Sequence, residues 1–313
     1  MDFTGGITFT GGLSVTPQPP SYSVYAIFGY GINSGSTNVS VTNLVSNTGV
    51  VATDTTGVGT ARGYLAAAGY GNDKAIFGYG FNSPTNYSMT NLVSNTGVVS
   101  TDTTGVGTAR FGLAAAGYGV DKAIFGYGYA SSQVSMTNLV SNTGVVATDT
   151  TGVGTIRYLL AASGYGTDKA IFGYGLNASF TAVSMTNKVS NTGVVATDTT
   201  GVGTARNYLA AAGYGSDKAI FGYGFTNIAL SLTNLVSNTG VVATDTTGVG
   251  TARVALAAAS YGTDKAIFGY GGSSGGAVQS MTNKVSNTGV VATDTTGVGT
   301  ARNYLAAASY GST

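Results

Sequence analysis

Residues 26–31 read Ala-Ile-Phe-Gly-Tyr-Gly, and the same six residues occur six times along the chain. A motif repeated at intervals of 47 to 49 residues is typical of architectures in which every copy forms one supersecondary unit. The sequence therefore predicts six copies of one unit. Their phenylalanines are Phe28, Phe77, Phe125, Phe172, Phe221 and Phe268.

Each copy contains several strand-like segments around this motif. In the copy from Arg62 to Thr103, residues 64–69, 74–79, 88–94 and 97–101 favour β-strands. Asn-Thr-Gly and Thr-Thr-Gly provide turns between them, and no segment has the 3.6-residue periodicity of a helix. Four short strands in each of six copies predict an all-β fold, a six-bladed β-propeller of four-stranded antiparallel blades. A parallel β-solenoid is the alternative, although its coils are usually shorter.

The two ends of the repeated region predict how the ring closes. Residues 25–313 begin on the second strand of a copy and end on a first strand that contains Leu305. We expect the C-terminal strand to pair with Ala26–Tyr30 and complete the N-terminal blade, because closure removes exposed sheet edges. Residues 1–24 lie outside the repeats and are predicted to form an N-terminal arm with a Pro-rich connector.

The composition excludes several classes of function. Only 8% of the residues are charged, the net charge is +1, and the chain has no Cys, His or Trp. All twelve acidic residues are aspartates. We therefore expect no enzymatic activity, no cofactor, no metal site and no nucleic-acid partner. No long apolar run and no basic leader are present, so we expect neither membrane insertion nor a signal peptide.

The arrangement of Arg62-Gly-Tyr-Leu-Ala-Ala-Ala-Gly before Asp73-Lys-Ala-Ile-Phe-Gly-Tyr-Gly resembles the kelch repeat family. In that family an arginine precedes a small-residue inner strand, and the next hydrophobic strand ends in a glycine pair. Here Gly-Tyr-Gly replaces Gly-Gly, and no tryptophan is present for the fourth strand. The resemblance covers residues 25–313. It implies a propeller in which ligand binding is commonly found on one face.

One aspartate and one arginine recur in every copy. Each aspartate lies in Thr-Asp-Thr-Thr-Gly, and an arginine follows eight residues later. A ring of carboxylates could hold a metal or act in acid–base catalysis. We interpret the set instead as structural ion pairs that cap turns and tie neighbouring strands together. The residues are Asp54, Arg62, Asp102, Arg110, Asp149, Arg157, Asp198, Arg206, Asp245, Arg253, Asp294 and Arg302.

The six copies differ from one another in two places. One is the residue pair after each arginine, and the other is the loop after each AIFGYG motif. The start of a first strand and the end of its antiparallel neighbour lie at the same sheet edge, so both sets should gather on one face, here called the variable face. The loops are residues 32–39, 81–87, 129–134, 176–183, 225–230 and 272–279.

The variable face is predicted to bind a ligand. Its Tyr, Phe, Asn and Ser residues form the mixture found in recognition loops. Drift in tolerant surface loops is the alternative, but the pairs after the arginines vary beside a nearly constant Leu-Ala. The predicted ligand-binding residues are Tyr64, Phe81, Phe111, Tyr129, Tyr158, Phe180, Asn207, Tyr208, Phe225, Asn303 and Tyr304.

The opening MDFTGGITFTGG and the near-identical repeats are similar to those of bacteriophage virion proteins. This resemblance implies a tail or virion-surface protein, located on the virion or an extracellular surface, that binds a cell-surface glycan or protein receptor. It also implies that residues 1–24 contact other virion proteins. A virion decoration protein without a ligand and a glycan-processing propeller enzyme are the alternatives. The absence of His and Glu argues against the enzyme.

Overall fold

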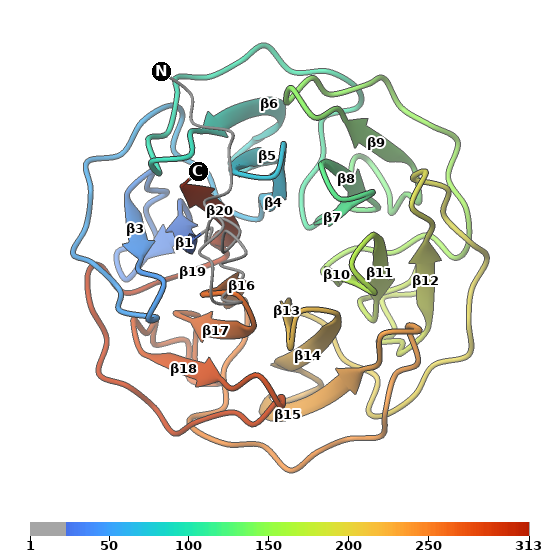
Figure 1. Ribbon diagram of the computed structural model, residues 1–313. Helices are drawn as coiled ribbons and strands as arrows, with labels where there is room; N and C mark the ends of the chain where they lie inside the picture. The colour runs from blue at the N-terminus through green and yellow to red at the C-terminus, as the bar shows by residue number, and fades with distance from the viewer. Residues whose placement is uncertain (1–22, 313) are drawn as a thin grey trace, which may run out of the picture.

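The computed structural model of the chain describes residues 23–312, and every regular element within them is a β-strand. The strands form six three-stranded antiparallel sheets and one pair of two-residue strands. The sheets are arranged as a ring around a central axis (Figure 1). The predicted all-β class is confirmed. Most of the predicted N-terminal arm lies outside the described residues, and its last two residues, Ser23 and Val24, belong to β1.

Each sheet has an inner, a middle and an outer strand, counted from the axis (Figure 1). The inner strands are β4 (Ala66–Tyr70), β7 (Ala114–Tyr118), β10 (Ala161–Tyr165), β13 (Ala210–Tyr214), β16 (Ala257–Tyr261) and β20 (Ala306–Ser312). The middle strands are β1 (Ser23–Gly29), β5 (Lys74–Asn82), β8 (Lys122–Gly126), β11 (Lys169–Gly173), β14 (Lys218–Phe225) and β17 (Lys265–Gly269). The outer strands are β3 (Thr42–Val45), β6 (Thr85–Val93), β9 (Thr137–Val140), β12 (Thr186–Val189), β15 (Ala229–Val236) and β18 (Thr282–Val285). The two-residue strands are β2 (Ile32–Asn33) and β19 (Arg302–Asn303).

The prediction of four strands per sheet is wrong, because each sheet has three. The expected fourth segment lies beside the outer strand but is joined to it only by isolated bridges, such as Val45↔Val51 and Thr42↔Thr55. The side chain of Asn43 donates hydrogen bonds to the Ala52 carbonyl and to the Asp54 carboxylate. The first of these bonds uses a backbone carbonyl that a continuous ladder would need. The segment therefore stays a linker between sheets.

The two ends of the described chain pair with each other, as predicted. β20 and β1 form an antiparallel ladder from Gly29↔Ala306 to Ser23↔Ser312, with β3 on the other side of β1. In Figure 1 the dark red β20 lies against the blue β1. β20 also contacts the inner strands β16 and β4, so the inner strands follow one another in a closed cycle.

The core consists of wedges between neighbouring sheets, and the AIFGYG motif fills them. Tyr79 of one sheet packs its ring against Phe125 of the next, with centroids 5.2 Å apart, and the other five sheets repeat this contact. A Cβ atom on Gly78 would lie 2.7 Å from the Phe125 ring, so the first glycine of the motif admits that ring. The motif is therefore the contact between sheets, and both aromatic side chains are fully buried.

Backbone hydrogen bonds also pass from sheet to sheet around the ring. The second glycine of each motif donates to the carbonyl of an arginine in the next sheet, as in Gly31 to Arg62 and Gly271 to Arg302. At one end of the sheets lie the turns that join inner to middle strands, here called the inner turns. Their glycines donate backbone hydrogen bonds to the next inner turn, as in Gly71 to Asp121. Val24 and Gly311 take part in this second set through Gly262 to Val24 and Gly311 to Asp73. Each of these sets forms a closed circle of six bonds.

Candidate binding face

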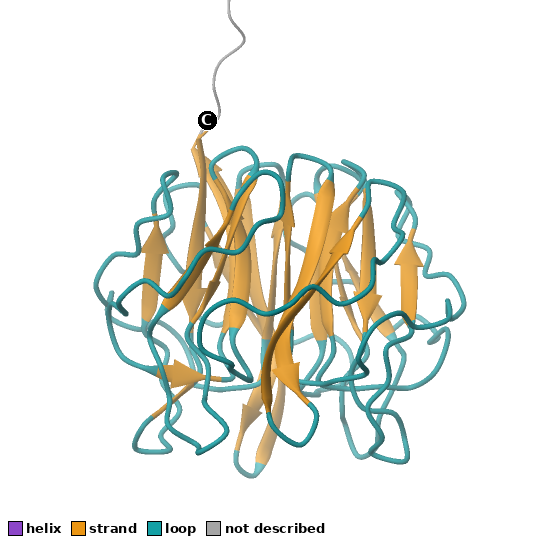
Figure 2. Ribbon diagram, turned by 90° about the horizontal axis from the view of Figure 1, so that it is seen from below, coloured by secondary structure: helices purple, strands orange, loops and turns teal. Residues whose placement is uncertain are grey.

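The two variable sets meet at one end of the sheets, as the strand directions predict. The first residue after each arginine pairs with the first residue after the AIFGYG motif of the same sheet, for example Phe111 with Tyr129. In the hairpins β5–β6 and β14–β15 the strand pairing continues toward this end, as far as Asn82↔Thr85 and Phe225↔Ala229. Figure 2 shows these hairpins and the C-terminal end of the described chain on opposite sides of the disc.

The second residue after each arginine lies nearest the axis at the variable face. All six have a left-handed backbone, with φ between 51° and 62°. Each donates its backbone N–H to the carbonyl of the equivalent residue in the preceding sheet, at 2.7 to 3.0 Å, which makes a third closed circle of six hydrogen bonds. These residues are Tyr64, Gly112, Leu159, Tyr208, Ala255 and Tyr304.

Most of the predicted aromatic residues form one connected cluster. One branch runs from Phe81 through Phe111, Tyr129 and Tyr158 to Phe180, with centroid separations of 5.2 to 6.2 Å. A second branch stacks Tyr64 on Tyr304 at 3.9 Å and continues to Tyr208 at 5.6 Å. The Tyr64–Phe111 contact at 5.6 Å joins the two branches. We call this set of eight residues the aromatic arc.

The arc contains residues of five of the six sheets. The sixth sheet, β16-β17-β18, carries the small residues Val254, Ala255 and Gly272 at the equivalent positions. Seven members of the arc are half-buried, while Phe180 is 61% exposed. The face is therefore aromatic on five sheets and lined by small residues on one, and this difference breaks the symmetry of the repeats.

Three predicted residues lie outside the arc. Phe225 and Asn207 line a cavity beside Phe180 and Tyr208. Asn207 is only 5% exposed, and its Oδ1 has no hydrogen-bond partner in the described part of the chain. The Oδ1 of Asn303, the equivalent residue of the closing sheet, is also buried without a partner among residues 23–312. Asn303 pairs through its backbone with Ile32.

The variable face carries no charged side chain in its six loops or in the six pairs after the arginines. Burial raises the pKa of Tyr64, Tyr158 and Tyr208 above the ordinary value for a phenol, and neighbouring tyrosines add to the effect. These phenols are therefore neutral at physiological pH. A neutral surface of this kind offers no electrostatic attraction to phosphate or other ions.

The arginines of the predicted structural ion pairs do not lie beside the aspartates that precede them by eight residues. Arg206 precedes the inner strand of its sheet and lies 3.9 Å from Asp245, which follows the outer strand of the same sheet. It does not pair with Asp198. Three other arginines lie 3.8 to 3.9 Å from the equivalent aspartate. Asp245 accepts shorter hydrogen bonds from the backbone and hydroxyl of Thr204 and from Asn234. The aspartate thus holds the linker that arrives from the preceding sheet.

Each arginine is fully buried between two sheets. Arg206 donates to the Tyr223 carbonyl at 2.7 Å and to Asn234 at 2.7 Å, and its guanidinium lies 4.5 Å from the ring centre of Tyr174 in the neighbouring sheet. All six arginines make the equivalent cation–π contact. The geometry supports the structural interpretation, because the guanidinium groups have no route to the surface.

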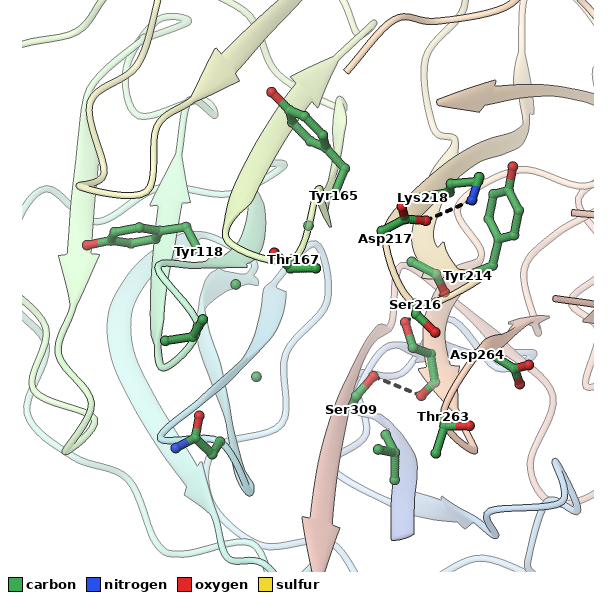
Figure 3. A pocket seen from close by; sticks show the side chains of 18 of the residues that line it. Tyr118, Tyr165, Thr167, Tyr214, Ser216, Asp217, Lys218, Thr263, Asp264 and Ser309 are labelled. Carbon is green, nitrogen blue, oxygen red and sulfur yellow. Dashed lines mark hydrogen bonds and ion pairs between the residues drawn. The ribbon is translucent and has the colours of Figure 1, made fainter. Parts of the chain in front are cut away.

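The opposite end of the disc has a depression of about 340 Å³ at the mouth of the central channel (Figure 3). The inner turns surround it, and each of five turns carries an Asp-Lys ion pair such as Asp217–Lys218 at 2.8 Å. The sequence pattern gives no sign that these turns converge on one channel. Because each charge is paired with its neighbour, the depression has no excess charge with which to select a ligand.

Comparisons with protein-family models and with curated proteins find no match to this chain. Within residues 23–312, no three acidic, His or Cys side chains gather as a metal site would require. The same residues contain no helix that is long and apolar enough to span a membrane.

Proposed function

We propose that this chain is a six-bladed, kelch-like β-propeller that recognises a receptor without enzymatic activity. The receptor is an uncharged glycan, and it binds at the variable face. The protein acts on a bacteriophage tail or virion surface, where residues 1–24 contact other virion proteins. The phage assignment rests on the sequence resemblance alone. The glycan assignment rests on the aromatic arc.

The aromatic arc carries the proposal because it is a large aromatic surface without charge. A pyranose ring presents apolar C–H faces and hydroxyl edges, so it matches half-buried aromatic rings mixed with Asn, Ser and Gln. No acidic residue belongs to the six loops or the six residue pairs that form the variable face. Binding without hydrolysis is therefore the expected outcome, since glycoside hydrolysis ordinarily uses a pair of carboxyl groups.

The position of the chain ends also supports the proposal. Ser23 and Ser312 pair at the end of the closing sheet that lies away from the variable face. A segment that leaves the disc at Ser23 can join a larger particle while the variable face stays open to solvent. This arrangement suits a receptor-binding protein better than a ring that is covered on both faces.

The test is binding to an array of neutral and charged glycans, with product analysis at the reducing end. The variants Phe111→Val and Tyr158→Val replace an arc residue by the valine that the equivalent position, Val254, already carries. We expect each to lower affinity at least tenfold, about 1.4 kcal/mol. The control is Val145→Ala, an exposed residue on the opposite side, which should bind as the wild type does.

The outcomes separate the alternatives. Wild-type affinity in the folded Phe111→Val and Tyr158→Val variants would place the receptor site elsewhere. Glycan cleavage would identify an enzyme, and the absence of retention by any glycan would favour a decoration protein. Binding should also persist from about 50 mM to about 500 mM salt, because screening weakens only charge-dependent contacts.

A further inference from the structure

A cavity of about 480 Å³ lies at the variable face, where the sheet β10-β11-β12 meets the sheet β13-β14-β15. Phe180, Asn207, Tyr208 and Phe225 are among its lining residues, and none of the lining residues is charged. Its volume lies within the range of small-molecule sites. The inference drawn from it rests on the proposed function and specifies a subsite of the same face.

Three loops of the variable face share one turn, which makes Phe180 directly comparable with two other residues. Ser36, Phe180 and Gly276 each donate a backbone N–H to the carbonyl three residues earlier, at 2.9 to 3.0 Å. Each has a left-handed backbone, with φ of 57°, 56° and 80°. The same turn thus forms with a serine, a phenylalanine or a glycine at its tip.

Phenylalanine is the least favourable of the three residues at this position. A bulky side chain at positive φ is strained relative to glycine, because its Cβ atom crowds the backbone. The ring of Phe180 makes an edge contact with Tyr158 at 6.2 Å, yet it is 61% exposed. Because most of the ring is exposed, it contributes little apolar burial to the stability of the fold. A ligand that covers the ring would account for the choice of residue.

Asn207 supplies a second, independent observation in the same cavity. Its side chain is 95% buried, as its 5% exposure shows, and Oδ1 lacks a hydrogen-bond partner in residues 23–312. An unpartnered buried acceptor destabilises the fold, because it has lost its hydrogen bonds to water without gaining others. The terminal torsion of asparagine is soft, so a rotation about it can present Oδ1 to a donor in the cavity.

We infer that this cavity binds one uncharged pyranose residue of the receptor glycan. The apolar face of the sugar stacks on Phe180, and one of its hydroxyl groups donates a hydrogen bond to Asn207 Oδ1. Phe225 packs against the other side of the sugar. The absence of charge in the lining favours neutral hexoses over sialic acids and amino sugars with a free amine.

The experiment measures binding of methyl glycosides of glucose, galactose and mannose and of methyl N-acetylglucosaminide, by saturation-transfer NMR and calorimetry, up to about 10 mM. We expect Phe180→Gly to raise the melting temperature and lower affinity at least tenfold. Asn207→Val, which introduces the residue found at Val254, should also lower affinity at least tenfold while the protein stays folded. Ser36→Gly is the matched control for stability, because it relieves the same backbone strain at a residue that does not line the cavity.

The result that would overturn the subsite is wild-type affinity in Phe180→Gly or in Asn207→Val. If Phe111→Val removes binding while both of these variants keep it, the subsite is wrong and the proposed function stands. If neither the methyl glycosides nor the glycan array binds to the wild-type protein, the subsite and the proposed function both fail.

Discussion

Left-handed backbone at residues other than glycine recurs at equivalent positions around the ring. It is found at the tyrosine of each AIFGYG motif, at the second residue after most of the arginines, and in four of the inner turns. The conformation is the same whichever residue occupies the position, so the fold dictates it and the residue adapts. Replacements at these positions therefore have effects whose sign can be derived.

Val120 is the clearest case, because it combines a φ of 66° with 73% exposure. A β-branched residue is poorly suited to this conformation, whereas asparagine tolerates it and already occupies the equivalent position, Asn72. We expect Val120→Asn to increase the free energy of unfolding by about 1 kcal/mol. Denaturant unfolding monitored by circular dichroism would measure the change.

Val145→Asn is the control for that substitution. Val145 is 66% exposed but has no positive φ, so the replacement relieves no strain and should give no gain. An equal stabilisation of both variants would show that the removal of exposed apolar surface, and not the backbone conformation, is responsible.

At the scale of single elements, the buried arginine fixes each inner strand to its surroundings. Arg206 bonds to two groups of its own sheet and lies on Tyr174 of the neighbouring sheet. Arg206→Ala leaves those carbonyl groups without a donor and opens a cavity between sheets. We expect a loss of about 3–5 kcal/mol in the free energy of unfolding, because the cavity of a large buried side chain and the unpaired buried acceptors both contribute.

Asp245→Asn should destabilise the protein less than Arg206→Ala does. The carboxylate is 27% exposed and lies 3.9 Å from Arg206, so its attraction to the guanidinium is weak. Its main role is to accept hydrogen bonds from Thr204, and asparagine keeps one acceptor for this purpose. A larger effect for Asp245→Asn than for Arg206→Ala would contradict this account of the ion pair.

The elements differ in how far the sequence could predict them. The alternation of strand-like segments and turns around AIFGYG was sufficient to predict the inner, middle and outer strands. The fourth strand failed because Asn43 and its equivalents take the carbonyl group that a ladder would use, and such a side-chain bond leaves no periodic pattern. The aspartate beside each arginine could not be predicted from the sequence either. Every arginine follows one aspartate by eight residues, but the ring brings it to a different one.

For the whole molecule, the position of the variable face was predictable from strand direction, since the first and second strands of a sheet run antiparallel. The composition of the aromatic arc was predictable for the same reason. The cavity beside Phe180 was not, because it depends on the left-handed turn at the tip of one loop and on the packing of the next sheet. Loop lengths alone do not specify that turn.

The stability of the whole ring should depend on pH only at the extremes. Burial opposes ionisation of Asp54, Asp102 and their equivalents, but hydrogen bonds from threonine and asparagine hold the pKa of each below its ordinary value. Their contribution is present above the unfolded pKa of about 3.9 and is lost as the pH falls through the lower folded value.

Buried tyrosines determine the pH above which the ring loses stability. Burial raises the pKa of Tyr30 and Tyr127 to about 12. This contribution is present below the unfolded pKa of about 10 and is lost as the pH rises through the folded value. Melting temperatures measured across the pH range should therefore be level between about pH 5 and pH 9 and should fall on both sides. A steep change near neutral pH would contradict this, since the chain has no histidine.

The central claim is that the repeated residues build the ring and the variable residues bind the ligand. A protein in which the five aromatic residues and Asn207 of the variable pairs are replaced by the residue found at Val254 or Ala255 tests it most directly. The replacements are Phe111→Val, Tyr158→Val, Asn207→Val, Tyr64→Ala, Tyr208→Ala and Tyr304→Ala. We predict a protein that melts cooperatively with wild-type β-structure and binds no glycan on the array. A folded protein that keeps wild-type binding would contradict the account.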